Sequence, residues 1–155
     1  GGSHYYKENG HTGANVPKLD LTTAPQIAAR IASAIAEGLV TSCHDCSEGG
    51  LAVALAEMAF AGGLGIEANL RGLPRSKDCF RTDAQLFSES NSRYIVEVTP
   101  ENFDAFAKKM LNLPFGQIGT VTETPRLVVQ DEDGRKVIDA GIDILKQTWQ
   151  KTFNW

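Results

Sequence analysis

The sequence is short of cysteine, of basic charge and of long apolar runs, and each shortage excludes a class of protein. Three cysteines are an odd number and do not make the disulfide framework of a small secreted domain, so we expect a reduced, cytoplasmic protein. Lys and Arg number 15 against 19 Asp and Glu, and the net charge of −4 argues against a nucleic-acid partner. The most apolar stretch, residues 51–64, contains Glu57 and two glycines and is too short to span a membrane.

The remaining composition is that of an ordinary globular domain. Of the 155 residues, 42% are hydrophobic and 22% are charged, which is enough for one domain with its own core. The chain has no signal peptide and does not begin with Met, so we expect a piece of a longer protein. The start Gly2-Ser3-His4 is compatible both with native sequence and with the remnant of an expression tag.

The first 18 residues differ from the rest of the chain. Residues 1–18 are polar and contain several glycines, which predicts an extended N-terminal arm or linker whose anchors are Tyr5, Tyr6 and Val16. We expect residues 19–155 to form a single domain.

The spacing of apolar residues predicts helices and strands in alternation along this domain. Ile27, Ile31 and Ile35 recur every four residues, which predicts one face of a helix that Thr22 or Thr23 caps. The later elements are a strand at 39–43, a strongly apolar helix at 51–60, a strand at 64–70, a short helix at 83–87, a strand at 94–98, a helix from 100, strands at 115–121, 126–129 and 136–138, and a C-terminal helix carrying Ile142, Leu145, Trp149 and Phe153. This order predicts an α/β (α+β) fold, a layered domain with a mixed β-sheet packed by helices.

The most informative stretch is SCHDCSEGGL, which joins the strand at 39–43 to the apolar helix. A helix start has backbone N–H groups without partners and therefore accepts anions, and Gly49 and Gly50 leave room for a phosphate or another backbone. Asp45 and Glu48 have the spacing of a capping box, which would occupy the same N–H groups. The stretch is therefore either a structural corner or an anion-facing site in which Ser47, later amides or a bridging magnesium ion hold the anion.

The same stretch contains the pair Cys43 and Cys46 in Cys-x-x-Cys spacing. A redox pair also sits between a strand and a helix start, whereas a zinc site would need further ligands from Cys79 and the scattered histidines. A third reading is two small, half-buried residues. A reactive Cys46 with a low pKa would favour redox chemistry.

Small hydrogen-bonding residues also gather in the sequence SESNSR at 88–93, directly before the strand at 94–98. Ser and Asn bond to their own backbone in turns, so this segment is either a plain turn or a polar loop that faces a ligand.

Several separated segments together resemble one enzyme family. The segments SCHDCSEGGLAVALAEMAFAGGLG, LFSESNSRYIVEV and FGQIGTVTE, with GGSHYYK and VPKLDL near the start, closely resemble the C-terminal part of the phosphoribosylformylglycinamidine synthases, subunit PurL. The superfamily also includes aminoimidazole ribonucleotide (AIR) synthetase and selenophosphate synthetase. The resemblance implies an AIR synthase-related C-terminal domain, the second such domain of a longer enzyme. The sequence departs from the family pattern at His4, where an acidic residue is common, and at Cys46, where valine is frequent.

The resemblance implies an ATP-dependent ligase of de novo purine biosynthesis. Such enzymes use ATP and Mg²⁺ to activate an amide oxygen of formylglycinamide ribonucleotide, and ammonia from a glutaminase then gives formylglycinamidine ribonucleotide. The implied partners are the N-terminal domains of the same enzyme and, in the multi-subunit form, the glutaminase subunit PurQ and the small subunit PurS.

The resemblance also implies which residues of this chain face a ligand. The catalytic histidine and most ATP and magnesium ligands of the family belong to the N-terminal domains, so we assign no catalytic residue and no metal ligand here, and we expect the isolated chain to be inactive and to hold no cofactor tightly. By internal pseudo-symmetry, the serine-rich segment would face an auxiliary nucleotide or substrate pocket. The residues assigned to this pocket are Asp45, Ser47, Gly49, Gly50, Ser88, Glu89, Ser90, Asn91 and Arg93.

Two other readings stay open. In the first, the chain is a non-catalytic domain that docks other domains or the glutaminase. In the second, it is part of another ATP-dependent synthetase of the same superfamily.

Overall fold

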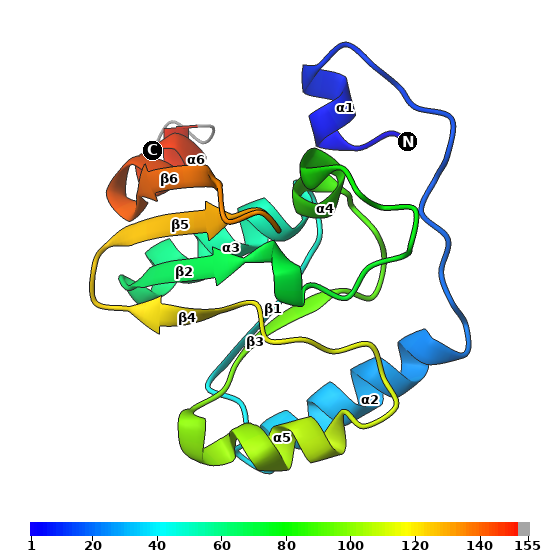
Figure 1. Ribbon diagram of the computed structural model, residues 1–155, viewed down its shortest axis with the longest axis vertical. Coiled ribbons are helices and arrows are strands. Elements are labelled where there is room, and N and C mark those ends of the chain that lie inside the picture. Colours follow the sequence, from blue (N-terminus) through cyan, green and yellow to red (C-terminus); the bar gives the residue numbers. More distant parts are fainter. Residues whose placement is uncertain (152–155) are drawn as a thin grey trace.

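The computed structural model describes residues 1–151, and Phe153, expected on the C-terminal helix, lies outside them. Helices and strands alternate as predicted, which confirms the mixed α+β class (Figure 1). The α-helices are α1 (His4–Glu8), α2 (Thr23–Ala36), α3 (Gly50–Gly62), α4 (Thr82–Phe87), α5 (Phe103–Lys109) and α6 (Ile142–Lys151). The strands are β1 (Ser42–Asp45), β2 (Gly65–Asn69), β3 (Tyr94–Glu97), β4 (Gly119–Thr122), β5 (Arg126–Gln130) and β6 (Lys136–Gly141), and two 3-10 turns, η1 (Leu70–Gly72) and η2 (Pro100–Asn102), complete the order.

A four-stranded mixed sheet forms the larger layer. Its order is β4-β2-β5-β6, with β2 and β5 parallel and the other two pairs antiparallel. Ile66 and Ala68 of β2 and Leu127 and Val129 of β5 point to one face and are buried, because successive side chains of a strand alternate between the faces. Helices α3 and α6 cover this face (Figure 1).

Helix α3 is fixed on most of its sides. Five of its apolar residues are buried in the core under the sheet: Leu51, Ala52, Ala54, Leu55 and Ala59. Its charged residue, Glu57, accepts a hydrogen bond from the Trp149 indole N–H of α6 at 2.9 Å and lies 3.0 Å from His44 Nε2 of β1. The helix axis is therefore held by the sheet, by α6 and by β1 together.

A second, smaller layer lies apart from the sheet. Helices α2 and α5 pack side by side, with Ile31 and Ala34 against Phe106 and Met110, and β1 and β3 lie between this pair and the sheet (Figure 1). Arg30, which the sequence pattern places outward, donates to the carbonyl oxygen of Lys109 at 2.6 Å, so it closes the end of α5.

Three local expectations are wrong. The arm is not extended throughout, because Ser3 accepts a hydrogen bond from the Tyr6 N–H and starts helix α1. Val16 does not anchor the arm, since it is 72% exposed, and Ile35 does not continue the buried face of α2, since it is 48% exposed. Thr22 is the N-cap residue of α2, as expected, but its side chain makes no capping hydrogen bond, and the Asp20 carboxylate accepts from the N–H groups of residues 22 and 23 instead.

In residues 1–151, none of the helices is long and apolar enough to cross a membrane.

The two hydrophobic clusters predict two separable responses to mutation. Phe106→Ala should lower the free energy of unfolding by about 3–5 kcal/mol, because it leaves a cavity between α2 and α5. Hydrogen exchange should rise first in α2 and α5 and last in β2 and β5. Phe80→Ala, at a side chain that is 74% exposed, is the control and should change stability by less than about 0.5 kcal/mol. Equal acceleration of exchange in both layers would contradict this separation.

Candidate functional site

The glycine turn at the start of α3 lies directly against the serine-rich segment 88–93, here called the bend. Gly49 and Gly50 have positive φ angles of 76° and 64°. A Cβ on Gly50 would lie 2.5 Å from the Ser88 carbonyl oxygen, closer than real contacts allow. Glycine is therefore required at Gly50 both for the backbone conformation and for the approach of the bend. The structure thus brings together two of the segments that the sequence singled out.

Glu89 of the bend caps the glycine turn. Its Oε1 accepts a hydrogen bond from the Gly49 N–H at 2.9 Å and another from the His4 N–H, also at 2.9 Å. The Gly50 N–H donates to the Ser47 carbonyl oxygen at 3.1 Å. Both glycine amides are therefore used inside the protein.

The predicted capping box is wrong. A capping residue has an extended backbone, whereas the residue before α3 is Gly49 in the left-handed conformation. Asp45 instead ends β1 and accepts a hydrogen bond from the Ser47 hydroxyl, which lowers the pKa of Asp45. Glu48 lies 4.0 Å from His4 Nε2, at the surface. The cap of α3 comes from the Glu89 carboxylate, 40 residues after Gly49.

Arg93 shapes the bend from within. Its Nη1 donates to the carbonyl oxygen and the hydroxyl of Ser88 at 3.0 and 3.1 Å, and its Nη2 donates to the Gln85 carbonyl oxygen at 3.2 Å. The Ser90 hydroxyl lies 3.4 Å from that of Ser88. Within residues 1–151 no carboxylate forms an ion pair with Arg93. The bend therefore carries a half-buried positive charge that only neutral acceptors contact, next to two hydroxyl groups.

The tip of the bend has a backbone conformation that side chains rarely adopt. Ser92 has a φ angle of 60°, and Asn91 before it is exposed. Strained residues of this kind gather at ligand-facing turns, and the neighbouring contacts at Ser88 and Arg93 hold this one in place.

Helix α1 is docked on α4 beside the bend (Figure 1). The Tyr5 ring stacks on Phe87 with 4.8 Å between ring centroids and 2° between planes. The Tyr5 hydroxyl donates to Asp83 at 3.1 Å. Hydrogen bonds from Arg81, and secondarily from Tyr5, lower the pKa of the Asp83 carboxyl to about 2. Aromatic stacking, a charged hydrogen bond and Glu89 together hold the arm.

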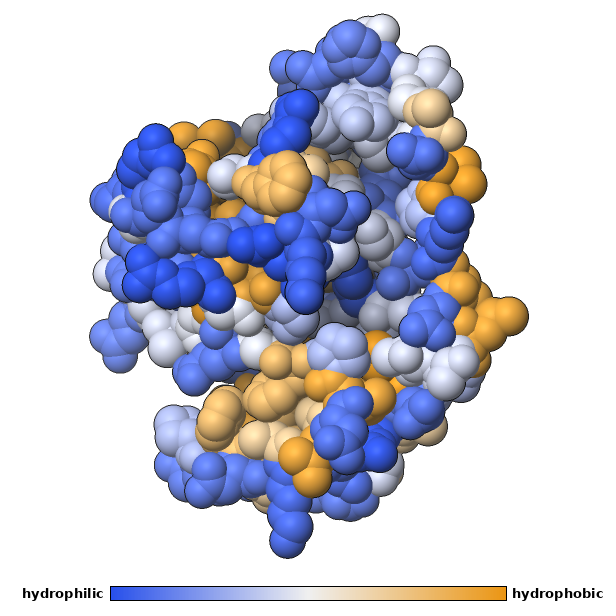
Figure 2. All heavy atoms as spheres, turned by 45° about the vertical axis from the view of Figure 1, so that its right-hand side comes forward, coloured by the Kyte–Doolittle hydropathy of each residue, from blue (hydrophilic) through white to orange (hydrophobic). Residues whose placement is uncertain are grey.

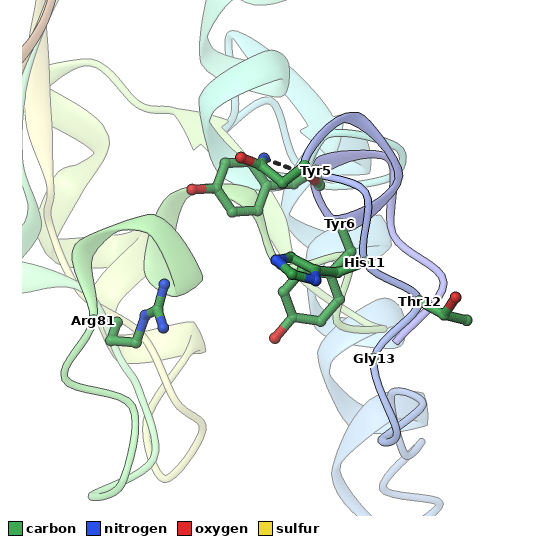
Figure 3. A pocket seen from close by; sticks show the side chains of 7 residues that line it. Tyr5, Tyr6, His11, Thr12, Gly13 and Arg81 are labelled. Carbon is green, nitrogen blue, oxygen red and sulfur yellow. Dashed lines mark hydrogen bonds between the residues drawn. The ribbon is translucent and has the colours of Figure 1, made fainter.

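A cavity of about 410 Å³ opens between the arm and Arg81. Figure 3 shows Arg81 on one side and the rings of Tyr5, Tyr6 and His11 on the other. A second cavity, of about 420 Å³, lies near β4 and η1 and includes Arg71 and Gln117. Neither cavity is lined by any of the nine residues assigned from the sequence. Of these nine, Gly50 is buried, whereas Asp45, Ser47 and Asn91 are exposed and the others are half-buried.

The cysteines do not have the environment of a redox pair. Burial raises the pKa of both the Cys46 and the Cys43 thiol. Redox-active cysteines have lowered pKa values instead. Across residues 1–151 no group of three His, Cys, Asp or Glu side chains is placed to hold a metal ion.

Sequence reasoning missed the part that the arm takes in this site. At positions 83–89, the His4 backbone N–H contacts Glu89, and Tyr5 contributes a ring and a hydroxyl; no residue spacing links them to these positions. The available signal was Ser3 three residues before Tyr6, which marks a helix start.

Comparisons with known proteins agree with this architecture. The family described as "AIR synthase related protein, C-terminal domain" matches residues 1–132. Subunit PurL of phosphoribosylformylglycinamidine synthase from Deinococcus radiodurans is 38% identical over 154 residues, covering 97% of this chain and 20% of that protein. The same subunit from a Synechocystis species is 42% identical over 156 residues, covering 97% of this chain and 19% of that protein. The chain thus spans about a fifth of the length of the curated relatives it matches.

Solved structures share the fold. Thermotoga maritima PurL complexed with FGAR superposes with a TM-score of 0.73 at 22% identity, covering 84% of this chain and 22% of that one. The hydrogenase maturation protein HypE superposes with a TM-score of 0.61 at 17% identity, covering 72% and 41% of the two chains. At these identities the likeness concerns the fold.

The contact between Gly50 and the bend predicts a large cost for adding one methyl group. Gly50→Ala should lower the free energy of unfolding by roughly 2–4 kcal/mol, since it combines a left-handed backbone with overpacking against Ser88. Gly134→Ala is the matched control, because Gly134 has a φ angle of 83° but nothing within 4 Å of the added carbon. It should cost only about 1–2 kcal/mol. Equal losses in urea unfolding would contradict the close contact.

The low pKa of Asp83 predicts a loss of stability in acid. The carboxylate is favoured in the folded state, so its contribution is complete above the ordinary value of 3.8 and disappears as the pH falls through about 2. At pH 7 Asp83→Asn should cost about 1–2 kcal/mol, because the group is partly exposed and screened. The difference from the wild type should shrink towards zero near pH 2 in urea unfolding. A difference that stays constant with pH would contradict this assignment.

Proposed function

The chain belongs to the family of AIR synthase related protein C-terminal domains, and from this premise we propose that it is a C-terminal domain of a phosphoribosylformylglycinamidine synthase, subunit PurL. The support is the identity of 34–42% to curated PurL subunits over essentially the whole chain. In the complete enzyme, this domain would serve an ATP-dependent ligase that converts formylglycinamide ribonucleotide and glutamine-derived ammonia to formylglycinamidine ribonucleotide in purine biosynthesis.

The proposed ligands and partners follow from the relatives. T. maritima PurL has been solved with FGAR, with ATP and with ADP, and also as the assembly PurLQS. For the present chain we propose the same classes of ligand, and as partners the N-terminal domains of its own enzyme together with PurQ and PurS subunits.

We propose that the bend supplies one wall of a nucleotide or substrate pocket. Phosphoryl transfer depends on positioning and on neutralising phosphate charge, and ATP supplies the phosphoryl group. Arg93 is the main support for this proposal, because it is a half-buried cation that no carboxylate neutralises within residues 1–151. The hydroxyls of Ser88 and Ser90 lie beside it and can donate to phosphate oxygens. Asn91 extends this polar rim at the tip of the bend.

Magnesium does not fit the residues of this chain alone. The described residues contain no group of three metal-ligating side chains, and Asp45 is engaged with the Ser47 hydroxyl. Mg²⁺ accepts six oxygen ligands, so the remaining ligands would have to come from the ATP phosphates and from other domains.

A structural and docking role is the second candidate. It is favoured by the internal use of both glycine amides, which leaves the turn without a free donor at Gly49 or Gly50. Three apolar side chains between α1 and α2 are also exposed, namely Val16, Leu19 and Leu21. Figure 2, in which this side comes forward, shows apolar surface along the right-hand edge of the molecule. Such surface is typical of contacts between domains.

Titration with ADP and Mg²⁺ distinguishes the two candidates. If the bend faces a nucleotide, the amide signals of Ser90 and Arg93 should shift, and Arg93→Gln should weaken binding about tenfold through the loss of a charged phosphate contact. Arg126→Gln is the matched control, because Arg126 pairs with Asp139 across strands β5 and β6 of the sheet.

An absence of shifts in the bend at millimolar ADP would support the docking role instead. ATP hydrolysis by the isolated chain at the rate of a complete synthase would contradict the assignment of catalysis to other domains.

A further inference from the structure

We propose that Glu89 is a positioning residue that couples two events, docking of the N-terminal arm and binding of an anionic ligand at the bend. Each of these events weakens the other. The inference rests on the proposed function, in which the bend meets phosphate. Its starting observation is that one oxygen, Glu89 Oε1, accepts from both the His4 N–H of the arm and the Gly49 N–H of the turn. Three segments that are distant in sequence therefore depend on one carboxylate.

The arm is held by few contacts, so the loss of one of them matters. Helix α1 has five residues, and none of them is buried. The stretch at 14–21 that connects the arm to α2 is exposed throughout. Docking of α1 on the body rests on the Tyr5 ring against Phe87, the Tyr5 hydroxyl on Asp83 and the His4 N–H on Glu89. Removing the Glu89 contact should measurably release the arm.

Glu89 also brings a negative charge close to the proposed anion site. It is the residue between Ser88 and Ser90 in the sequence, and the Ser88 hydroxyl lies 3.1 Å from Arg93 Nη1 and 3.4 Å from the Ser90 hydroxyl. A phosphate attracted by Arg93 would be repelled by the Glu89 carboxylate, because like charges at close range disfavour each other. The ligand therefore binds best when Glu89 moves away, and that movement breaks the bonds to His4 and Gly49.

The two equilibria are coupled in both directions. If an anion at the bend weakens arm docking, arm docking must weaken anion binding by the same factor, because the coupling is reciprocal. Docking of the arm therefore lowers the affinity of the bend for an anion. Glutamine at position 89 removes the charge and also weakens the two hydrogen bonds, because a neutral amide oxygen is a weaker acceptor than a carboxylate.

The first measurement needs no ligand. In the complete chain, hydrogen exchange at the His4 and Gly49 amides should accelerate together in Glu89→Gln, by about tenfold or more, since both lose a charged acceptor. In Glu48→Gln, which removes a charge near His4 but no bond to Gly49, exchange at the Gly49 amide should stay unchanged. Acceleration at only one of the two amides in Glu89→Gln would overturn the shared role of this carboxylate.

The second measurement uses ADP as the probe. Glu89→Gln should bind ADP about five- to tenfold more tightly than the wild type, which is the lower end of the usual range of coupling between sites. A chain lacking residues 1–13 should bind more tightly as well, whereas Glu48→Gln should differ by less than about twofold because its side chain is exposed and screened.

The outcomes separate the two claims. ADP binding to the bend with equal affinity in the wild type, in Glu89→Gln and in the shortened chain would overturn the inference and leave the proposed function intact. An absence of ADP binding in all of these chains would overturn the proposed function, and the coupling with it.

Discussion

The arrangement of the glycine turn, the bend and the arm depends on one carboxylate oxygen that accepts two hydrogen bonds. Glu89 Oε1 satisfies the Gly49 N–H at the start of α3 and the His4 N–H of the arm, both at 2.9 Å. Without it, helix α3 would begin at a left-handed glycine turn with no side-chain cap of its own. A charged acceptor suits this position, because the start of a helix carries the positive end of its dipole. The cap thus also fixes the bend and the arm relative to the helix.

This local arrangement is rigid because of what lies beneath it. Helix α3 is buried under the mixed sheet and tied by Glu57 to β1 and α6. Its leading end therefore cannot move without disturbing the core, and Gly50 allows the Ser88 backbone to press against it. Arg93 completes the bend through neutral acceptors only, which leaves its charge available. A rigid turn beside an available cation is what a site for a phosphorylated ligand requires.

Much of the fold could be predicted from local pattern. The apolar run at 51–60 indicated a buried helix, and the alternation of Ile66 and Ala68 with polar residues indicated a half-exposed strand, and both are confirmed. These elements are set by side-chain periodicity, which the sequence displays directly. The proximity of the glycine turn and the bend is also confirmed, although the ligand that the nine assigned residues would face stays a prediction.

The errors have a common physical cause. Asp45 and Glu48 had the spacing of a local capping box, but the cap comes from Glu89, because a carboxylate brought near by tertiary packing reaches the Gly49 amide instead. Helix α1 is too short to be stable alone and forms where Tyr5 can stack on Phe87. Both features arise from contacts between distant segments, and no local spacing encodes those contacts.

The central claim is that the arm, the turn and the bend share one carboxylate, and nuclear magnetic resonance tests it directly. In Glu89→Ala the amide proton resonances of His4 and Gly49 should both move upfield, because each amide loses the same charged acceptor. An amide proton of His4 or Gly49 that keeps its wild-type resonance in Glu89→Ala would contradict the account.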